Sequence, residues 1–187
     1  MIVTIPQPSM AVHAHDVPGF KYKMFNTWPL DPEENMEHIA DWVSQVATDA
    51  PGGHLRSLIF NCHGSCGSAK LSNKARLTVS TVGPFSKLKN LVNHILIIAC
   101  TVIRVKPGDN ANFWSDPGVR LCYELATKTK ARVYASNEYQ YVNLGTTLFG
   151  GFGDIDEYEG FILSVPPTGQ CAWLPSNYAL ALMLKSL

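Results

Sequence analysis

The run HILIIAC at residues 94–100 is the most apolar and most β-branched stretch of the chain. An apolar run of strand length without alternation is typical of a parallel strand that is covered on both faces. A second run, LRSLIFNC at 55–62, is bounded by glycines and leads directly into His63 and Gly64. We therefore expect two buried strands of one sheet, the first leading into a histidine and the second ending in Cys100.

Helix patterns precede and follow these two strands. Asp31 followed by Pro32 predicts a helix start, because an aspartate cap and a proline at the first helical position both favour one. Asp116 and Pro117 repeat the pattern and predict a second helix, which leads into a strand at 132–136. This alternation of strands and helices predicts an α/β fold with a mostly parallel central sheet and right-handed crossovers.

The length of 187 residues suits one compact domain and is too short for two ordinary ones. We expect an irregular N-terminal arm and a core, with a hairpin and a short helix between the two central strands. A glycine-rich loop, an edge hairpin and a final helix should complete the chain. The single domain, 1–187, is accordingly divided into 1–30 (arm), 31–140 (core) and 141–187 (loop, hairpin and helix).

Composition argues against several classes of function. The chain has 15 basic and 15 acidic side chains, so a general attraction to nucleic acid is not expected. No apolar run approaches the roughly 18 to 20 residues that cross a bilayer, and the N-terminus lacks the pattern of a Sec signal peptide. Five cysteines, an odd number, favour free thiols in a reducing compartment. We expect a cytoplasmic protein, or one delivered into a target cell by a non-Sec secretion system.

The two strand ends carry residues that suit nucleophilic catalysis. In an open parallel sheet, functional groups gather at the carboxyl ends of the strands, where the backbone opens into loops. A cysteine nucleophile needs a nearby base that takes its proton and later protonates the leaving amine, and histidine does both. His63 and Cys100 are therefore the candidate catalytic residues.

The strings LIFNCHG at 58–64 and ILIIAC at 95–100 resemble the caspase-like (clan CD) cysteine peptidases, including the gingipain, separase and CHAT-domain branches. The resemblance covers roughly residues 31–140. It implies a three-layer α/β/α sandwich and a thiol protease that needs no cofactor or metal, with Cys100 as nucleophile and His63 as general base and acid. It also implies an oxyanion hole formed by the backbone N–H groups of Gly64 and Cys100.

The resemblance implies protein or peptide substrates, and it extends to the stand-alone domains of bacterial toxins. A toxin or effector with a cognate inhibitor or immunity protein is one expected setting. The chain departs from caspases after the cysteine, where Thr101 and Val102 stand in place of Arg-Gly. By position alone, we assign substrate binding to Arg104, Asn137 and Tyr139.

Four alternatives stay open on the sequence. The same sheet could serve as a non-catalytic binding or scaffold module. A zinc site could form from Cys62, His63 and Cys66 with His54, and the pattern of His13, His15 and Asp16 could supply metal ligands. An acidic cluster could favour basic substrates, bind calcium or form a solvated loop; its members are Asp154, Asp156, Glu157 and Glu159.

Overall fold

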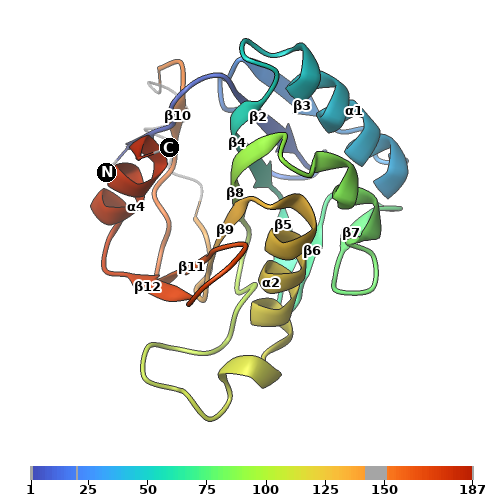
Figure 1. Cartoon of the computed structure of the whole chain (residues 1–187). Helices are drawn as coiled ribbons and strands as arrows, with labels where there is room; N and C mark the ends of the chain where they lie inside the picture. Colours follow the sequence, from blue (N-terminus) through green and yellow to red (C-terminus); the bar gives the residue numbers. More distant parts are fainter. Residues whose placement is uncertain (1, 20, 142–150, 187) are drawn as a thin grey trace.

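A seven-stranded sheet forms the centre of the computed structural model, which describes residues 2–19, 21–141 and 151–186. The order across the sheet is β12-β11-β9-β8-β4-β2-β3 (Figure 1). Its strands are β2 (Ser9–His13), β3 (Asn26–Pro29), β4 (Leu55–Asn61), β8 (Val92–Ile98), β9 (Arg132–Ser136), β11 (Ile162–Val165) and β12 (Ala172–Leu174).

The strands from β3 across to β9 run parallel to their neighbours. At the other edge, β11 pairs antiparallel with both β9 and β12. The expectation of a mostly parallel sheet is therefore corrected to a mixed sheet. For the β11–β12 pair the physical reason is the short connection, which allows only a hairpin, whereas a parallel pair needs a long crossover.

Two small sheets accompany the central one. A three-stranded sheet consists of β5 (His63–Ser65), β6 (Ser68–Lys70) and β7 (Arg76–Leu77), and a two-stranded one of β1 (Val3–Thr4) and β10 (Asp154–Ile155). The segment from His63 is thus a hairpin that turns at Cys66 and Gly67.

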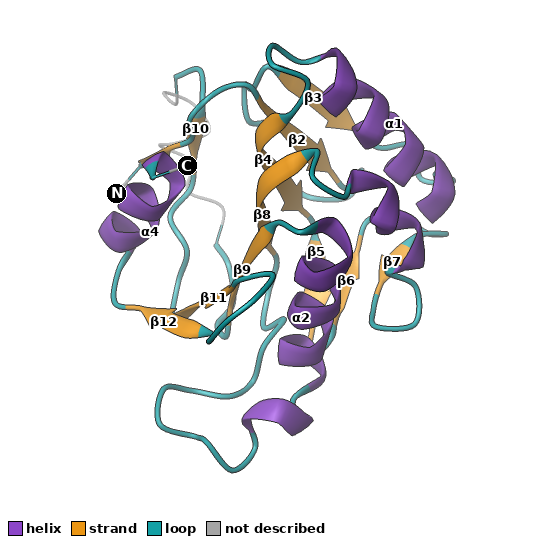
Figure 2. Cartoon of the chain, viewed as in Figure 1, coloured by secondary structure: helices purple, strands orange, loops and turns teal. Residues whose placement is uncertain are grey.

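Helices lie on both sides of the central sheet (Figure 2). The helix α1 (Met36–Asp49), the 3₁₀ segment η1 (Gly83–Leu88) and α2 (Pro117–Thr129) pack on one side, and α4 (Asn177–Lys185) packs on the other. A further 3₁₀ turn, η2 (Phe113–Ser115), precedes α2. None of the helices among the described residues combines the length and the apolar character that crossing a membrane requires.

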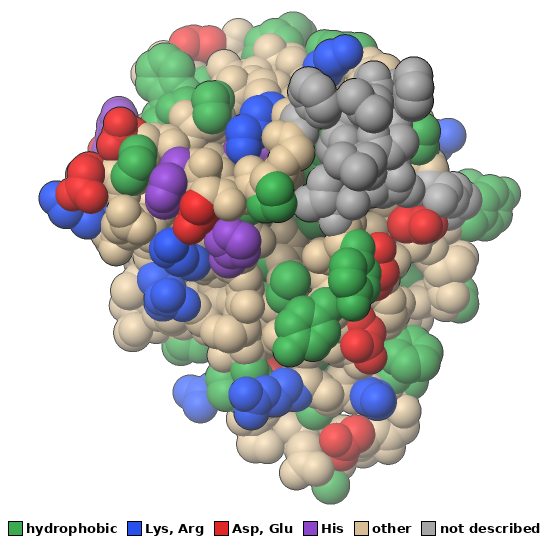
Figure 3. Space-filling view, turned by 180° about the vertical axis from the view of Figure 1, so that it is seen from behind, with side chains coloured by type: hydrophobic (Ala, Val, Ile, Leu, Met, Phe, Trp, Pro, Cys, Tyr) green, Lys and Arg blue, Asp and Glu red, His purple; other side chains and the backbone are tan. Residues whose placement is uncertain are grey.

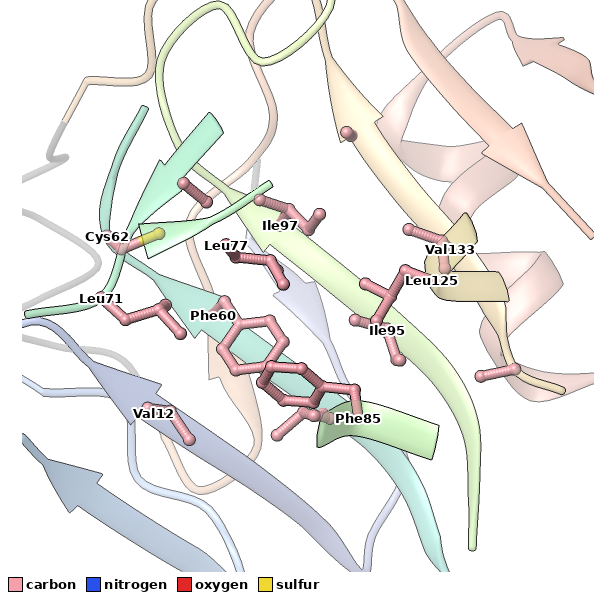
Figure 4. Packing of buried hydrophobic residues seen from close by; sticks show 14 of the residues in the cluster. Val12, Phe60, Cys62, Leu71, Leu77, Phe85, Ile95, Ile97, Leu125 and Val133 are labelled. Atoms are coloured by element: carbon pink, nitrogen blue, oxygen red, sulfur yellow. The ribbon is translucent and has the colours of Figure 1, made fainter. Parts of the chain in front are cut away.

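The central strands bury both faces, as their apolar sequences predict. Along β8, Ile95 and Ile97 join the core under α1 and α2, while Leu96 and Ile98 join the core under α4. Figure 4 shows the first of these cores, in which the rings of Phe60 and Phe85 meet edge to face with centroids 5.6 Å apart. Buried aromatic pairs of this geometry stabilise a core beyond their buried area alone.

The structure corrects the expected N-terminal arm and the start of the first helix. The expected irregular arm is wrong for residues 9–13 and 26–29, which form β2 and β3, and β2 lies inside the sheet between β3 and β4. The first helix begins at Met36 rather than at Asp31, because the Asn35 side chain accepts the His38 N–H and forms the cap. The cap by Asp116 is confirmed. The expected glycine-rich loop lies mostly outside the described residues.

Two buried histidines, His13 in β2 and His94 in β8, are held in the neutral form. Burial, with a smaller effect of the Lys21 charge, lowers the pKa of His13 to about 3. Burial, with smaller effects of Arg132 and Arg56, lowers the pKa of His94 to about 4. Both histidines gain protons more readily in the unfolded chain, so protonation favours unfolding.

We expect acid to destabilise the fold below the ordinary histidine pKa near 6.5. Stability should be complete above that pH and fall as the pH drops toward 4, by about 3 kcal/mol per pH unit when both histidines contribute. Urea unfolding between pH 7 and pH 4.5 measures this slope. His94→Gln should reduce the slope by about half, while the exposed His38→Gln should leave it unchanged. A slope that does not respond to His94→Gln would refute the assignment.

Candidate functional site

The two candidate catalytic residues follow neighbouring parallel strands. In the register of β4 and β8, Asn61 lies opposite Ile98. His63 and Cys100 each stand two positions further along, so they leave the sheet at the same level of its carboxyl edge. The hydrogen bond from the Cys62 N–H to the Ile98 carbonyl oxygen, 3.1 Å long, holds the two chains together beyond the last paired residues.

The backbone of Gly64 presses directly on that of Cys100. A Cβ atom at Gly64 would lie 2.5 Å from the Cys100 carbonyl oxygen, 2.8 Å from the Ala99 Cβ and 3.1 Å from the Cys100 nitrogen. Cβ atoms essentially never approach a neighbour as closely as the first two. Only glycine therefore allows the His63–Gly64 segment to lie against the Ala99–Cys100 segment.

A cavity of about 170 Å³ opens at this edge and has both His63 and Cys100 in its wall. Ile98 and the buried Cys62 give part of the cavity wall an apolar surface. The other lining residues come from segments far apart in the sequence. The lining residues are Val17, Pro18, Tyr22, Asn61, Cys62, His63, Ile98, Cys100, Gln140, Tyr141, Asp156 and Glu157.

Asp16 orients the imidazole of His63. The His63 Nε2 lies 3.3 Å from the Asp16 carbonyl oxygen and 3.6 Å from the Asp16 carboxylate oxygen Oδ1. Since both atoms are acceptors, Nε2 carries the proton and Nδ1 is left as the basic nitrogen. The side chain of His63 is 49% exposed, so it can meet a substrate.

Lys70 in turn fixes Asp16. The Lys70 Nζ donates to Asp16 Oδ2 over 2.7 Å, and this bond is the main reason that the pKa of Asp16 is lowered. Lys70 lies directly opposite His63 in the β5–β6 pair, so one hairpin carries both the histidine and the cation that holds its partner. In Figure 3, histidine, acidic and basic side chains lie beside one another on one face of the molecule.

The Cys100 thiol is half-buried, and its Sγ lies 3.8 Å from the Gln140 carbonyl oxygen. Within the described part of the chain, no hydrogen bond joins Cys100 to His63. Catalytic hydrogen bonds are often long before substrate binds and tighten in the complex. The next residue, Thr101, has φ of 45°, a left-handed conformation that is unusual for a β-branched residue and is typical of strained segments at functional sites.

The backbone N–H groups of Cys100 and Gly64 are the two that the sequence assigns to an oxyanion hole. Among the described residues, the Cys100 N–H donates to no acceptor. Gly64 lies opposite Ala69 in a hairpin with a two-residue turn, where alternate pairs lack hydrogen bonds, so its N–H points away from β6. Neither N–H is therefore used in the hairpin or in the strand pairing of the described residues.

The other four thiols lie in less reactive settings. Burial raises the pKa of Cys62, Cys66, Cys122 and Cys171. Cys62 and Cys122 are fully buried in the core. A thiol with a raised pKa is a poor nucleophile at neutral pH, because the thiolate is the reactive form.

Comparisons with protein-family models, with curated proteins and with solved structures gave no match. The function is therefore argued from the geometry of the site.

The three positions assigned to substrate binding lie outside the cavity wall. Arg104 is exposed, and its backbone N–H binds the Asp116 carboxylate. The buried Asn137 amide is committed to the backbone, donating to the Val105 carbonyl and accepting the Phe161 N–H. Tyr139 is exposed at the surface. Gln140 and Tyr141, the next residues of the same segment, line the cavity instead.

Neither of the two metal sites considered from the sequence forms a cluster of ligands among the described residues. No group of three or more His, Cys, Asp or Glu side chains with metal-binding geometry occurs among residues 2–19, 21–141 and 151–186. His13 is instead a buried residue whose Nε2 accepts the Tyr22 N–H over 3.2 Å, and its Nδ1 faces the Asn61 amide. This ring acts as a support between β2 and the segment that follows it.

Asp16 and Tyr22 were not expected at the site. Both come from the N-terminal segment, whose sequence shows little periodicity, so no pattern placed them near His63. Asp16 follows β2, and β2 is the neighbour of β4 in the sheet. Because His63 follows β4, this adjacency places Asp16 beside His63. A prediction of β2 as the third parallel strand would have indicated Asp16, since its carboxyl end lies at the same edge.

For the peptidase activity that the sequence predicts, we expect Asp16→Asn to lower the rate by roughly tenfold, mostly in kcat, since it removes the charge that Lys70 binds and leaves His63 less well oriented. Steady-state kinetics on a peptide substrate separates kcat from KM. Glu33→Gln is the matched control, because it breaks an exposed ion pair with Lys74, 2.8 Å long, between two residues that do not line the cavity. A rise in KM alone would show that Asp16 contacts substrate rather than His63.

Proposed function

We propose that this chain is a caspase-like cysteine endopeptidase that acts on protein or peptide substrates. The observation that carries the proposal is the contact between the His63–Gly64 and Ala99–Cys100 segments at the mouth of a cavity lined by both side chains. A three-layer α/β/α arrangement of the caspase type is part of the same proposal. Helices on both sides of the sheet support it.

The proposed reaction follows from the positions of these groups. The proton of the Cys100 thiol passes to His63 Nδ1, and the thiolate attacks the carbonyl carbon of the scissile peptide bond. The N–H groups of Gly64 and Cys100 stabilise the oxyanion that forms. Collapse breaks the C–N bond, and the amine leaves with the proton from His63.

Water completes the proposed cycle. It attacks the thioester carbonyl while His63 accepts one of its protons, and the C–S bond then breaks to release a carboxylic acid and the Cys100 thiol. In the proposal, Asp16 holds the ring in one orientation through both halves of the reaction, because its oxygens face Nε2 and leave Nδ1 to exchange the proton.

A peptide library tests the proposal without knowledge of the natural substrate. The protein is incubated with a mixed library at pH 6 to 8, and mass spectrometry identifies new peptide ends. Cleavage with a preference around the scissile bond, lost after treatment of the protein with iodoacetamide, is the expected result. The absence of new ends throughout this pH range would favour the binding or scaffold module.

A further inference from the structure

The segment that leads out of β9 is tied by hydrogen bonds to the chain on either side of it. On one side, the Glu138 carbonyl accepts the Thr101 N–H over 2.9 Å, directly after Cys100. On the other side, the Ser136 hydroxyl donates to the Glu159 carbonyl. The segment is therefore fixed between the chain that leaves Cys100 and the chain at Glu159.

The side-chain amide of Gln140 holds residue 140 itself in this segment. Its Nε2 lies 3.2 Å from three acceptors, which are the Ser136 hydroxyl and the carbonyl oxygens of Glu138 and Glu159. Its Oε1 accepts the Glu159 N–H over 3.3 Å, so the amide bonds the Glu159 backbone through both of its ends. Among the described residues, the backbones of Tyr139 and Gln140 form no hydrogen bond with another backbone group. The amide is therefore the main tie of residue 140.

The main-chain carbonyl of the same glutamine faces the Cys100 thiol. The distance of 3.8 Å between the Cys100 Sγ and the Gln140 oxygen suits a hydrogen bond from the S–H group, which is a weak donor. A thiol has a single proton, so an S–H group that donates to Gln140 does not donate to His63. Gln140 and His63 both line the cavity beside Cys100, and they therefore compete for this proton.

We infer that Gln140 is a positioning residue for the Cys100 thiol. Its amide, bonded to Glu159, keeps its carbonyl oxygen at the thiol, and in the free protein the thiol proton is therefore held away from His63. This arrangement is called the Gln140 clamp below. The inference rests on the proposed peptidase function and concerns the regulation of the same site. A substrate must displace the carbonyl before the proton passes to His63 Nδ1, a step in which one S–H bond breaks and one N–H bond forms.

Gln140→Met tests the clamp, because methionine matches glutamine in length but has no amide. The residue 140 carbonyl then loses its fixed position, and the thiol proton becomes available to His63. Alkylation of Cys100 by iodoacetamide at pH 7 is expected to be about fivefold faster, as the loss of one hydrogen bond implies. Peptide mapping of the same sample gives the rate at Cys66, which should not change. A thermal melt checks folding, and Gln140→Ala decides the matter if the methionine variant does not fold.

Gln45→Met is the matched control. It makes the same chemical change on the exposed surface of α1, where the Gln45 amide donates to Asp49 over 2.8 Å. The rate of alkylation at Cys100 should stay that of the unaltered protein.

The decisive comparison repeats Gln140→Met in a protein that carries His63→Gln. If the clamp withholds the proton from His63, the gain should fall below about twofold in this background, because no base is present to receive the proton. A gain of the same size in both backgrounds would mean that Gln140 merely covers the sulfur, and it would overturn the inference. The absence of any gain in the protein that retains His63 would also overturn it.

Alkylation needs no peptide hydrolysis, so the outcomes separate the clamp from the proposed function. A gain that depends on His63, together with no cleavage of the peptide library, would support the clamp and overturn the peptidase. Cleavage of the library by a protein whose Cys100 does not respond to Gln140→Met would support the peptidase and overturn the clamp. Failure of both measurements would overturn both.

Discussion

Replacing Cys100 or His63 with alanine is expected to lower the rate of peptide hydrolysis by about 10⁴-fold or more. The thiol supplies the bonding electrons, and the imidazole makes them available by removing the proton. Because the two groups act as one unit, the double variant should lose little more activity than either single variant. Initial rates on a cleaved library peptide measure all three.

Two controls make this result specific. Cys66→Ala removes a half-buried thiol that does not line the cavity, and His38→Ala removes an exposed histidine on α1. Both should retain hydrolysis close to that of the unaltered protein. If the losses from Cys100→Ala and His63→Ala multiply in the double variant, the two residues act independently and the proposed pair is wrong.

Gly64→Ala is expected to lower kcat by roughly 10² to 10³-fold, because the new Cβ would displace Gly64 from the Cys100 backbone and remove a donor of the oxyanion hole. The clash involves a backbone oxygen 2.5 Å away, so no side-chain rotation relieves it. The segment must shift, and some loss of stability should accompany the loss of rate. Kinetics and urea unfolding of the same variant give both quantities.

Gly83→Ala is the matched control, since a Cβ at Gly83 meets no atom within 4 Å. It makes the same chemical change at the start of η1 without a clash. Gly64→Ala that keeps full kcat while remaining as stable as Gly83→Ala would mean that the close approach of the two segments has no role in catalysis.

The central strands could be predicted because they carry their signal locally. β4 and β8 are apolar on both faces, and β9 was predicted at its observed bounds. Asp116 forms the cap of α2 with its own side chain, so that helix start also follows from adjacent residues. The pair of strand ends at His63 and Cys100 could be placed at one edge from the parallel order alone.

The rest of the site depends on contacts between distant segments. β2 contains the polar Ser9 and His13, which weaken its strand pattern, and these are buried only because the Pro6 carbonyl and the Tyr22 N–H satisfy them. Without β2 in the sheet, neither Asp16 nor Tyr22 could be placed beside His63. Asp156 and Glu157 likewise line the cavity from a segment more than 50 residues beyond Cys100.

The most direct test of the catalytic pair is the rate of alkylation of each cysteine by iodoacetamide at pH 7, followed by peptide mass spectrometry. The account predicts that Cys100 reacts faster than the other four thiols, whose pKa values are raised by burial. It also predicts that His63→Gln removes this advantage while the protein stays folded. Alkylation of Cys100 no faster than that of Cys66, or unchanged by His63→Gln, would contradict the account.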